Sequence, residues 1–262
     1  MVTPTRETPA DVLEALASAI QGAIGDDLAG LYVYGSYLAG GFDPEGSDLD
    51  LVAVLEREVD AADLATLGSV HDDLVRRYPA WANRLDVVFI GRESLRDFRS
   101  GRGSFAVISP GEPFRLRTDV ADWLQSWYLL RETSQRLVGM DVTELVPPIP
   151  RADFIAALVG HAELMRRRSR EEQSPGALAY ELLTTCRVLQ TVSAGVDPSK
   201  AEAADWVRQR WPMWAPVIDS ALACRHSGGR LGFDNEASRD EARQFIDVLA
   251  GEVVAARNMA SG

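Results

Sequence analysis

The residues whose types and spacing suggest chemistry are a glycine–serine pair and, after eleven further residues, two aspartates. Gly35 and Ser36 end a short apolar run, and Asp48 and Asp50 begin a second one. Side chains two positions apart in a strand point to the same face, so the two carboxylates are expected to project together. Because neighbouring carboxylates repel each other, such a pair favours a bound cation. Its oxygen ligands suit Mg²⁺.

The glycine–serine turn adds a phosphate-binding element to the same region. Its backbone N–H groups and the Ser36 hydroxyl can hold a phosphate that approaches closely at Gly35. A phosphate cradle beside metal-binding carboxylates is what nucleotidyl transfer requires. Each motif alone also occurs in ordinary turns and helix caps. Their order, their spacing and their attachment to two apolar runs favour the catalytic interpretation.

With these motifs the chain resembles the nucleotidyltransferase superfamily that includes DNA polymerase β and the antibiotic adenylyltransferases. That family pattern continues with a third carboxylate on a later strand, and Asp86 is the only acid in the apolar run 85–90. A charge is costly to bury in such a strand without a partner. Asp86 therefore lies at an exposed strand end near Arg84, or it joins Asp48 and Asp50 as a metal ligand or general base. In the antibiotic adenylyltransferases, the residue at this position resembles a glutamate general base. The shorter side chain of Asp86 favours metal binding.

Composition limits the class of protein and its partners. The chain has 262 residues, of which 46% are hydrophobic and 25% charged, as in ordinary globular proteins with one large or two small domains. A formal net charge of −12 argues against a large nucleic-acid surface and suits a polycationic small substrate. Two cysteines, no apolar stretch of membrane-spanning length and no signal-peptide pattern predict a cytoplasmic protein without membrane contact. A monomer is favoured.

Hydrophobic periodicity predicts how these motifs are positioned. Strands are expected near 30–34, 48–55 and 85–90, a first helix from Thr8-Pro9 to Gly25, and a second helix over 60–78. In the middle of the chain, the sequence predicts a connecting loop over 101–113 and one helix marked by Trp123, Trp127, Leu130, Leu137 and Val138. Beyond the proline-rich segment 146–150, helices are expected near 152–168, 175–194, 200–210, 213–225 and 236–256. The fold class is thus an α/β (α+β) nucleotidyltransferase domain with a small mixed sheet, over 1–147, and an all-α helical-bundle domain, over 148–262.

The helical half resembles the streptomycin/spectinomycin adenylyltransferases. The motifs that carry this resemblance are Ser174-Pro175, Tyr180, Cys186-Arg187, Gly195, Ser199-Lys200, Ala204-Asp205-Trp206 and Trp211-Pro212. The resemblance implies that Arg187 and Lys200 reach the phosphates of ATP. A triphosphate does need cations beyond Mg²⁺ to neutralise the leaving pyrophosphate. The structural alternatives are a buried ion pair of Arg187 with Glu181 or another acid, and an exposed Lys200 at a helix N-terminus.

The resemblance also implies the reaction partners. These are ATP, Mg²⁺ and a small polar acceptor, for which a cationic aminoglycoside-type antibiotic is the leading choice. Ala177 and Tyr180 replace an acid and a histidine that hold the antibiotic in the streptomycin/spectinomycin enzymes. The predicted acceptor contacts are Tyr180, at one of these positions, and Glu181, as an acid that would receive a cationic acceptor. Two alternatives stay open: transfer to a protein acceptor, as in nucleotidyltransferase antitoxins, and a nucleotide-sensing protein without catalysis.

Overall fold

The computed structural model describes residues 7–40, 42–44, 46–109 and 113–260, and these form two compact units. The first unit contains most of the chain up to Ile149, and the second begins at Pro150. None of the helices in the described ranges combines the length and apolar character that a membrane span requires. Each unit has its own architecture, and each is described by itself.

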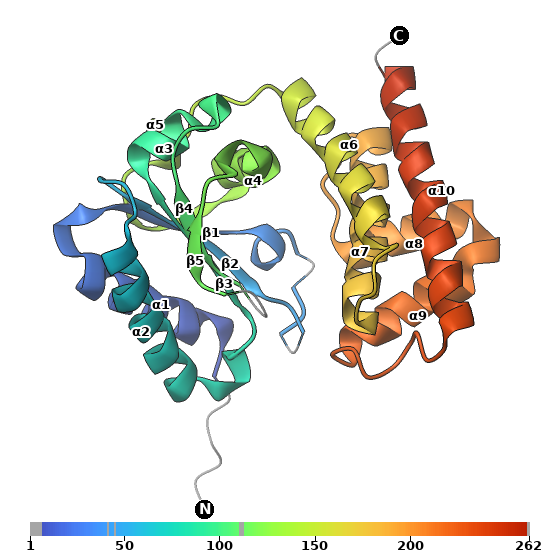
Figure 1. The fold of residues 1–262 in the computed structure, drawn as a ribbon, viewed down its shortest axis with the longest axis horizontal. Coiled ribbons are helices and arrows are strands. Elements are labelled where there is room, and N and C mark those ends of the chain that lie inside the picture. Colours follow the sequence, from blue (N-terminus) through green and yellow to red (C-terminus); the bar gives the residue numbers. More distant parts are fainter. Residues whose placement is uncertain (1–6, 41, 45, 110–112, 261–262) are drawn as a thin grey trace, which may run out of the picture. The chain divides into compact units, whose positions relative to one another are not determined.

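A six-stranded mixed sheet organises the first unit (Figure 1). Its strands, in the order β5-β4-β3-β2-β1-β6, are β1 (Leu28–Tyr34), β2 (Leu49–Leu55), β3 (Leu85–Gly91), β4 (Phe105–Ile108), β5 (Arg115–Arg117) and β6 (Gln135–Gly139). Neighbouring strands are antiparallel, except that β2 and β3 are parallel. Parallel strands need a crossover connection, which α2 (Ala61–Arg77) provides. As a result β2 and β3 both begin at the same edge of the sheet.

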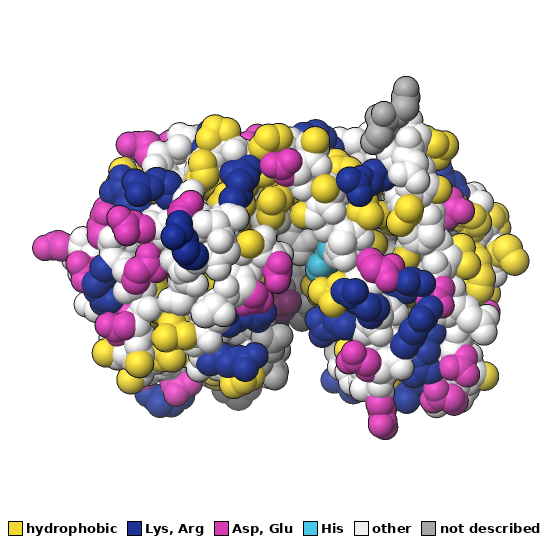
Figure 2. Space-filling view, turned by 45° about the horizontal axis from the view of Figure 1, so that its top comes forward, with side chains coloured by type: hydrophobic (Ala, Val, Ile, Leu, Met, Phe, Trp, Pro, Cys, Tyr) yellow, Lys and Arg dark blue, Asp and Glu magenta, His cyan; other side chains and the backbone are white. Residues whose placement is uncertain are grey.

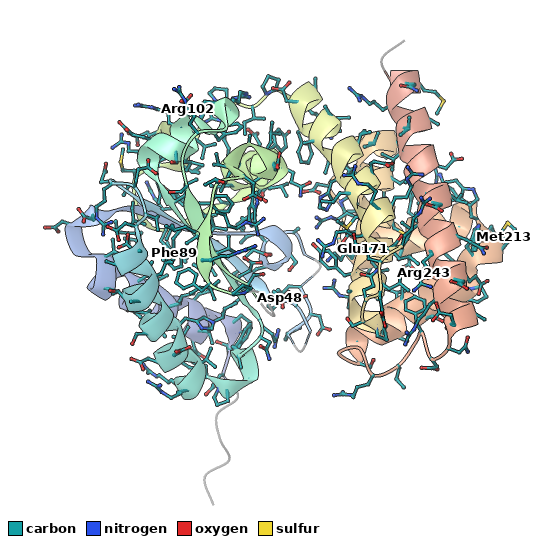
Figure 3. All side chains as sticks on the ribbon, viewed as in Figure 1. Asp48, Phe89, Arg102, Glu171, Met213 and Arg243 are labelled. Atoms are coloured by element: carbon teal, nitrogen blue, oxygen red, sulfur yellow. The ribbon has the colours of Figure 1, made fainter. Side chains whose placement is uncertain are left out.

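Helices cover both faces of this sheet. The α-helices of the first unit besides α2 are α1 (Pro9–Ile24), α3 (Arg92–Arg96), α4 (Leu124–Thr133) and α5 (Val142–Leu145). The short 3₁₀ helices of this unit are η1 (Gly25–Asp27), η2 (Gly35–Tyr37), η3 (Pro79–Trp81), η4 (Phe98–Ser100) and η5 (Val120–Trp123); a further one, η6 (Pro212–Trp214), belongs to the second unit. Figure 1 shows α1 and α2 on one side of the sheet and α4 on the other. One apolar cluster, which includes Phe89, packs under α1 and α2 (Figure 3), and a second lies between the sheet and α3, α4 and α5.

Capping residues fix where the first helices begin. Thr8 accepts a hydrogen bond from the backbone N–H of Asp11, whose carboxylate bonds back to the Thr8 backbone, and Pro9 occupies the first helical position. Asp60 and Asp63 form the same reciprocal arrangement at the start of α2. Such boxes satisfy N–H groups that have no partner inside the helix. Both helices begin within one residue of their predicted starts.

Two predictions for the middle of the chain are wrong. The segment 101–113 is not only a loop, because its four-residue run Phe105–Ile108 forms the fully buried strand β4. The helix marked by Trp123 and Trp127 ends at Thr133, and Leu137 and Val138 belong instead to the edge strand β6. Pairing with β3 and with β1 decides both segments. The local periodicity of such short stretches cannot report pairing with distant partners.

The second unit is all helical, as predicted. Its helices are α6 (Arg151–Arg168), α7 (Pro175–Ala194), α8 (Lys200–Arg210), α9 (Ala215–His226) and α10 (Glu236–Ala260). The central helix α7 packs against the other four and buries most of its residues. Ser174 and Pro175 begin it as N-cap and first helical residue. The mixed sheet followed by a helical domain confirms the predicted fold class.

Candidate active site

The predicted phosphate-binding turn follows directly after β1. Gly35 has a φ of +74°, a left-handed conformation that glycine adopts without strain. A Cβ atom added at Gly35 would lie 2.2 Å from Oδ2 of Asp50. The turn therefore needs a glycine for two separate reasons: its backbone conformation and the closeness of the carboxylate. Ser36 comes next, half-buried in η2, and η2 packs against β2.

Backbone pairing brings the predicted carboxylates to one edge of the sheet. Tyr34 pairs with Asp50 across the antiparallel strands β1 and β2, and Asp50 pairs with Asp86 across the parallel strands β2 and β3. Asp48 lies two residues before Asp50, exposed at the edge where β2 begins (Figure 3). Paired positions of neighbouring strands place their side chains on the same face. Asp50 and Asp86, both half-buried, therefore project from the face that packs under α4.

Ser109 is a member of this group that sequence reasoning missed. It follows β4 and donates a hydrogen bond from its hydroxyl to Oδ2 of Asp86, at 3.0 Å. The bond fixes the orientation of that carboxylate relative to the sheet. No sequence motif surrounds Ser109. Its place next to Asp86 follows from the β3–β4 register, in which Val87 pairs with Ile108.

The donor set suits a hard divalent cation only in part. Asp48, Asp50 and Asp86 supply carboxylate oxygens, which Mg²⁺ prefers. Within the described ranges, however, no three His, Cys, Asp or Glu side chains are gathered closely enough to hold a metal ion. Mg²⁺ commonly binds through one or two carboxylates and completes its shell with water and substrate phosphates. The residues therefore fit an ion that arrives with a nucleotide, rather than a metal site closed by protein ligands.

In the second unit, the structure brings Tyr180 and Lys200 together. Lys200 is the first residue of α8, and its Nζ lies 3.8 Å from the centroid of the Tyr180 ring on α7. Tyr180 is 51% exposed. A distance below about 6 Å is typical of a cation–π interaction. Two residues predicted for different roles, nucleotide binding and acceptor binding, are thus direct neighbours.

Glu181 is not placed as predicted. Its side chain is buried inside the helical unit, where Gln173 donates a hydrogen bond to Oε2 at 2.8 Å and Arg168 lies 3.5 Å from Oε1. Burial raises the pKa of this carboxyl. Glu181 therefore does not present an open carboxylate to an acceptor on the surface of this unit. Its partner is also Arg168 rather than Arg187, and no ion pair in the described part of the chain involves Arg187.

The pKa of His161 indicates that several cations lie near this residue of the helical unit. His161, on α6, has its pKa lowered to about 4, first by burial and then by the positive charges of Arg187, Lys200 and Arg168. At neutral pH its imidazole is therefore neutral. Figure 2 shows Lys and Arg side chains close to one another on the surface of this unit. Cations in a common neighbourhood, of which Arg187 and Lys200 are half-buried, favour binding of an anion.

Comparison with known proteins agrees with this description in both halves. Residues 16–100 match the family described as nucleotidyltransferase domain. Residues 144–252 match the family described as aminoglycoside adenylyltransferase, C-terminal domain.

A solved structure has the same fold. It is the spectinomycin adenyltransferase AAD(9) from Enterococcus faecialis, determined with ATP and spectinomycin. It aligns with a TM-score of 0.71 at 18% identity, over 94% of this chain and 99% of that one. The two domain matches identify this chain as an enzyme, a nucleotidyltransferase that resembles the aminoglycoside adenylyltransferases.

Proposed function

We propose that the enzyme transfers AMP from ATP to a hydroxyl group of an aminoglycoside-type antibiotic. The observation that carries the proposal is the alignment of three acids at one sheet edge beside a glycine turn. Asp50 is the register partner of Asp86 and lies against Gly35, and Asp48 is two residues away. The C-terminal match to the aminoglycoside adenylyltransferases supports an antibiotic as acceptor rather than a protein. The spectinomycin and ATP bound to AAD(9) support the same choice.

The residues predicted for the metal and nucleotide sites have separate roles in this reaction. The backbone at Gly35 and the hydroxyl of Ser36 hold phosphate oxygens, and Asp48 and Asp50 bind the cation that accompanies the nucleotide. When bound, Mg²⁺ supplies charge neutralisation at the phosphates. Asp86 binds the cation too, or accepts the proton of the acceptor hydroxyl.

The bond changes follow from this arrangement. The acceptor hydroxyl gives its proton to Asp86 or to water, its oxygen forms a bond to the α-phosphorus of ATP, the bond from that phosphorus to the β-phosphate oxygen breaks, and pyrophosphate leaves. Arg187 and Lys200 neutralise charge on the leaving pyrophosphate. In this proposal the nucleotidyltransferase domain spans 1–147 and the helical domain spans 148–262.

Acceptor-dependent release of pyrophosphate tests the proposal. The full-length enzyme with Mg²⁺ and ATP is offered a panel of aminoglycosides and spectinomycin, with a reaction lacking acceptor as blank. At least one antibiotic is expected to release pyrophosphate and to gain the mass of one AMP. If no antibiotic is modified and a protein becomes labelled instead, the proposed acceptor class is wrong.

A matched pair of variants ties the activity to the sheet edge. Asp50→Asn removes an anionic ligand without changing shape, so turnover is expected to fall by orders of magnitude while folding is retained. Asp72→Asn makes the same chemical change at an exposed position on α2 and is expected to leave turnover unchanged. Comparable losses in both variants would contradict the assignment.

A further inference from the structure

The most informative unassigned contact is the one between the only lysine of the chain and an exposed tyrosine ring. Lys200 is the single lysine of this sequence, and the other side chains that are positively charged at pH 7 belong to arginines. A lysine ammonium is a compact point charge on a flexible four-carbon stem, unlike the planar arginine fork. Its position therefore depends on what surrounds it.

The helix end and a neighbouring cation both act against this ammonium. Lys200 occupies the first position of α8, whose cap is formed by Ser199 and Glu202. The positive end of the helix dipole disfavours a cation there. Arg187 and Lys200 both act on His161, so the two cations share one neighbourhood and repel each other.

The Tyr180 ring supplies an opposing attraction. The ammonium lies 3.8 Å from the ring centroid, well inside the range in which the negative face of an aromatic ring attracts a cation. Tyr180 is seven residues before Arg187 on α7, and residues seven apart lie on the same helix face. The ring thus holds Lys200 on the side of α7 that also carries Arg187.

We propose that Tyr180 is a positioning residue for Lys200: its ring holds the ammonium on the face of α7 that carries Arg187, so that both cations are in place before the nucleotide phosphates arrive. This inference rests on the proposed function, and it assigns Tyr180 to nucleotide binding rather than to the acceptor. Holding a flexible cation in its bound position reduces the entropy lost on binding. The hydroxyl of Tyr180 has no part in it.

Two variants separate the ring from the hydroxyl. Tyr180→Phe keeps the aromatic face, and Tyr180→Leu removes it while keeping an apolar side chain. In the full-length enzyme, the Kd for Mg·ATP measured by calorimetry is expected to stay within about two-fold in Tyr180→Phe. In Tyr180→Leu it is expected to rise by about 2- to 30-fold, the range of one cation–π interaction. Equal Kd values in the two variants would overturn the proposal.

A spectroscopic signature tests the contact itself. Because the chain has one lysine, lysine labelled at its ε-carbon reports on Lys200 alone. The ε-protons are expected upfield of their usual position through the ring current, to stay there in Tyr180→Phe and to return to the usual position in Tyr180→Leu. An unshifted resonance in the unmodified enzyme would overturn the proposal.

The Lys200→Ala background distinguishes this inference from the proposed function. Lys200→Ala alone is expected to weaken Mg·ATP binding, and adding Tyr180→Leu to it is expected to cause no further loss. A further loss of the full size would mean that Tyr180 acts without Lys200, and the inference would fail while the proposed function stands. If Lys200→Ala leaves ATP binding unchanged, the phosphate role of Lys200 fails and the inference fails with it. A change in acceptor Kd without any change in ATP Kd would return Tyr180 to the acceptor.

Discussion

The two units place their proposed site residues by different means. In the sheet unit, backbone pairing between β1, β2 and β3 sets the positions of Asp50 and Asp86, and a short side chain leaves each carboxylate few choices. In the helical unit, Lys200 stands on a long side chain and depends on the Tyr180 ring. Because strand pairing sets these positions, an Asp-to-Asn substitution at the sheet edge can remove the charge without changing the shape of the site. On the helices, the neighbours of a cation matter as much as the cation.

Asp86→Asn gives the largest expected effect and tests the backbone-placed side of this comparison. If Asp86 is the general base, transfer is expected to fall by about 10²- to 10⁴-fold while the Kd for Mg·ATP stays within a few-fold. If Asp86 is mainly a metal ligand, the transfer rate is expected to fall and the Kd for Mg·ATP is expected to rise. Turnover assays and ATP calorimetry on the same preparation separate the two cases. Unchanged values in both would make Asp86 an ordinary strand-end acid.

Gly35→Ala tests whether the turn must accommodate Asp50. The new Cβ meets Oδ2 of Asp50 at 2.2 Å in a left-handed backbone conformation. The matched control is Gly101→Ala, because Gly101 also has a positive φ, of +67°, but has open space around its added Cβ. Both variants are expected to lose about 1–2 kcal/mol of unfolding free energy from the backbone conformation. Only Gly35→Ala is expected to lose most of its turnover as well, and equal turnover in the two would contradict the role of the contact.

The pH dependence of stability tests the crowding of cations on the helices. The pKa of His161 is about 4 in the folded chain and about 6.5 when unfolded. Between these values the unfolded chain binds more protons, so stability is present above pH 6.5 and is lost as the pH falls toward 4. His161→Gln is expected to flatten the loss over this range in denaturant unfolding. Glu181, whose raised pKa acts in the opposite direction, is the same in both proteins. Identical slopes in the two would show that His161 is not held neutral.

Ser109→Ala is the smallest change and sharpens the account of Asp86. Loss of the hydroxyl donor leaves Asp86 on its strand but less firmly oriented. About 0.5–1.5 kcal/mol of stability is the usual contribution of one hydrogen bond, and a few-fold drop in turnover is expected. Thr66→Ala, which removes an exposed hydroxyl from α2, serves as control. A turnover equal to that of the control would mean that the strand alone orients Asp86.

Local signals in the sequence predict most helices and three central strands. Thr8-Pro9 and Ser174-Pro175 mark helix starts because capping and proline geometry act within a few residues. The strand β6 escaped prediction because its Leu137 and Val138 become a strand only through pairing with β1. Long-range pairing leaves little trace in a five-residue segment.

The same limit applies to the candidate site. Asp48, Asp50 and Asp86 could be found because acids are conspicuous in apolar strands, and the structure aligns Asp50 with Asp86. Ser109 could not be found, because a serine after a strand is ordinary and its partner is 23 positions away. Glu181 was expected at an acceptor surface, but the central position of α7 buries it. Burial within a helical bundle depends on which neighbours surround a helix, and helical spacing alone does not report that.

The aspartates of β2 and β3 also bear on how the chain finds its fold. Both strands begin with leucine and aspartate and are otherwise apolar, and both faces of the sheet are covered. Hydrophobicity alone therefore says little about which face each side chain should take. A slip of one residue would turn Asp50 and Asp86 into the apolar cluster under α1 and α2, at a high desolvation cost. The desolvation cost thus disfavours misregistered pairing of β2 and β3, and a chain with apolar residues at both positions would lack that penalty.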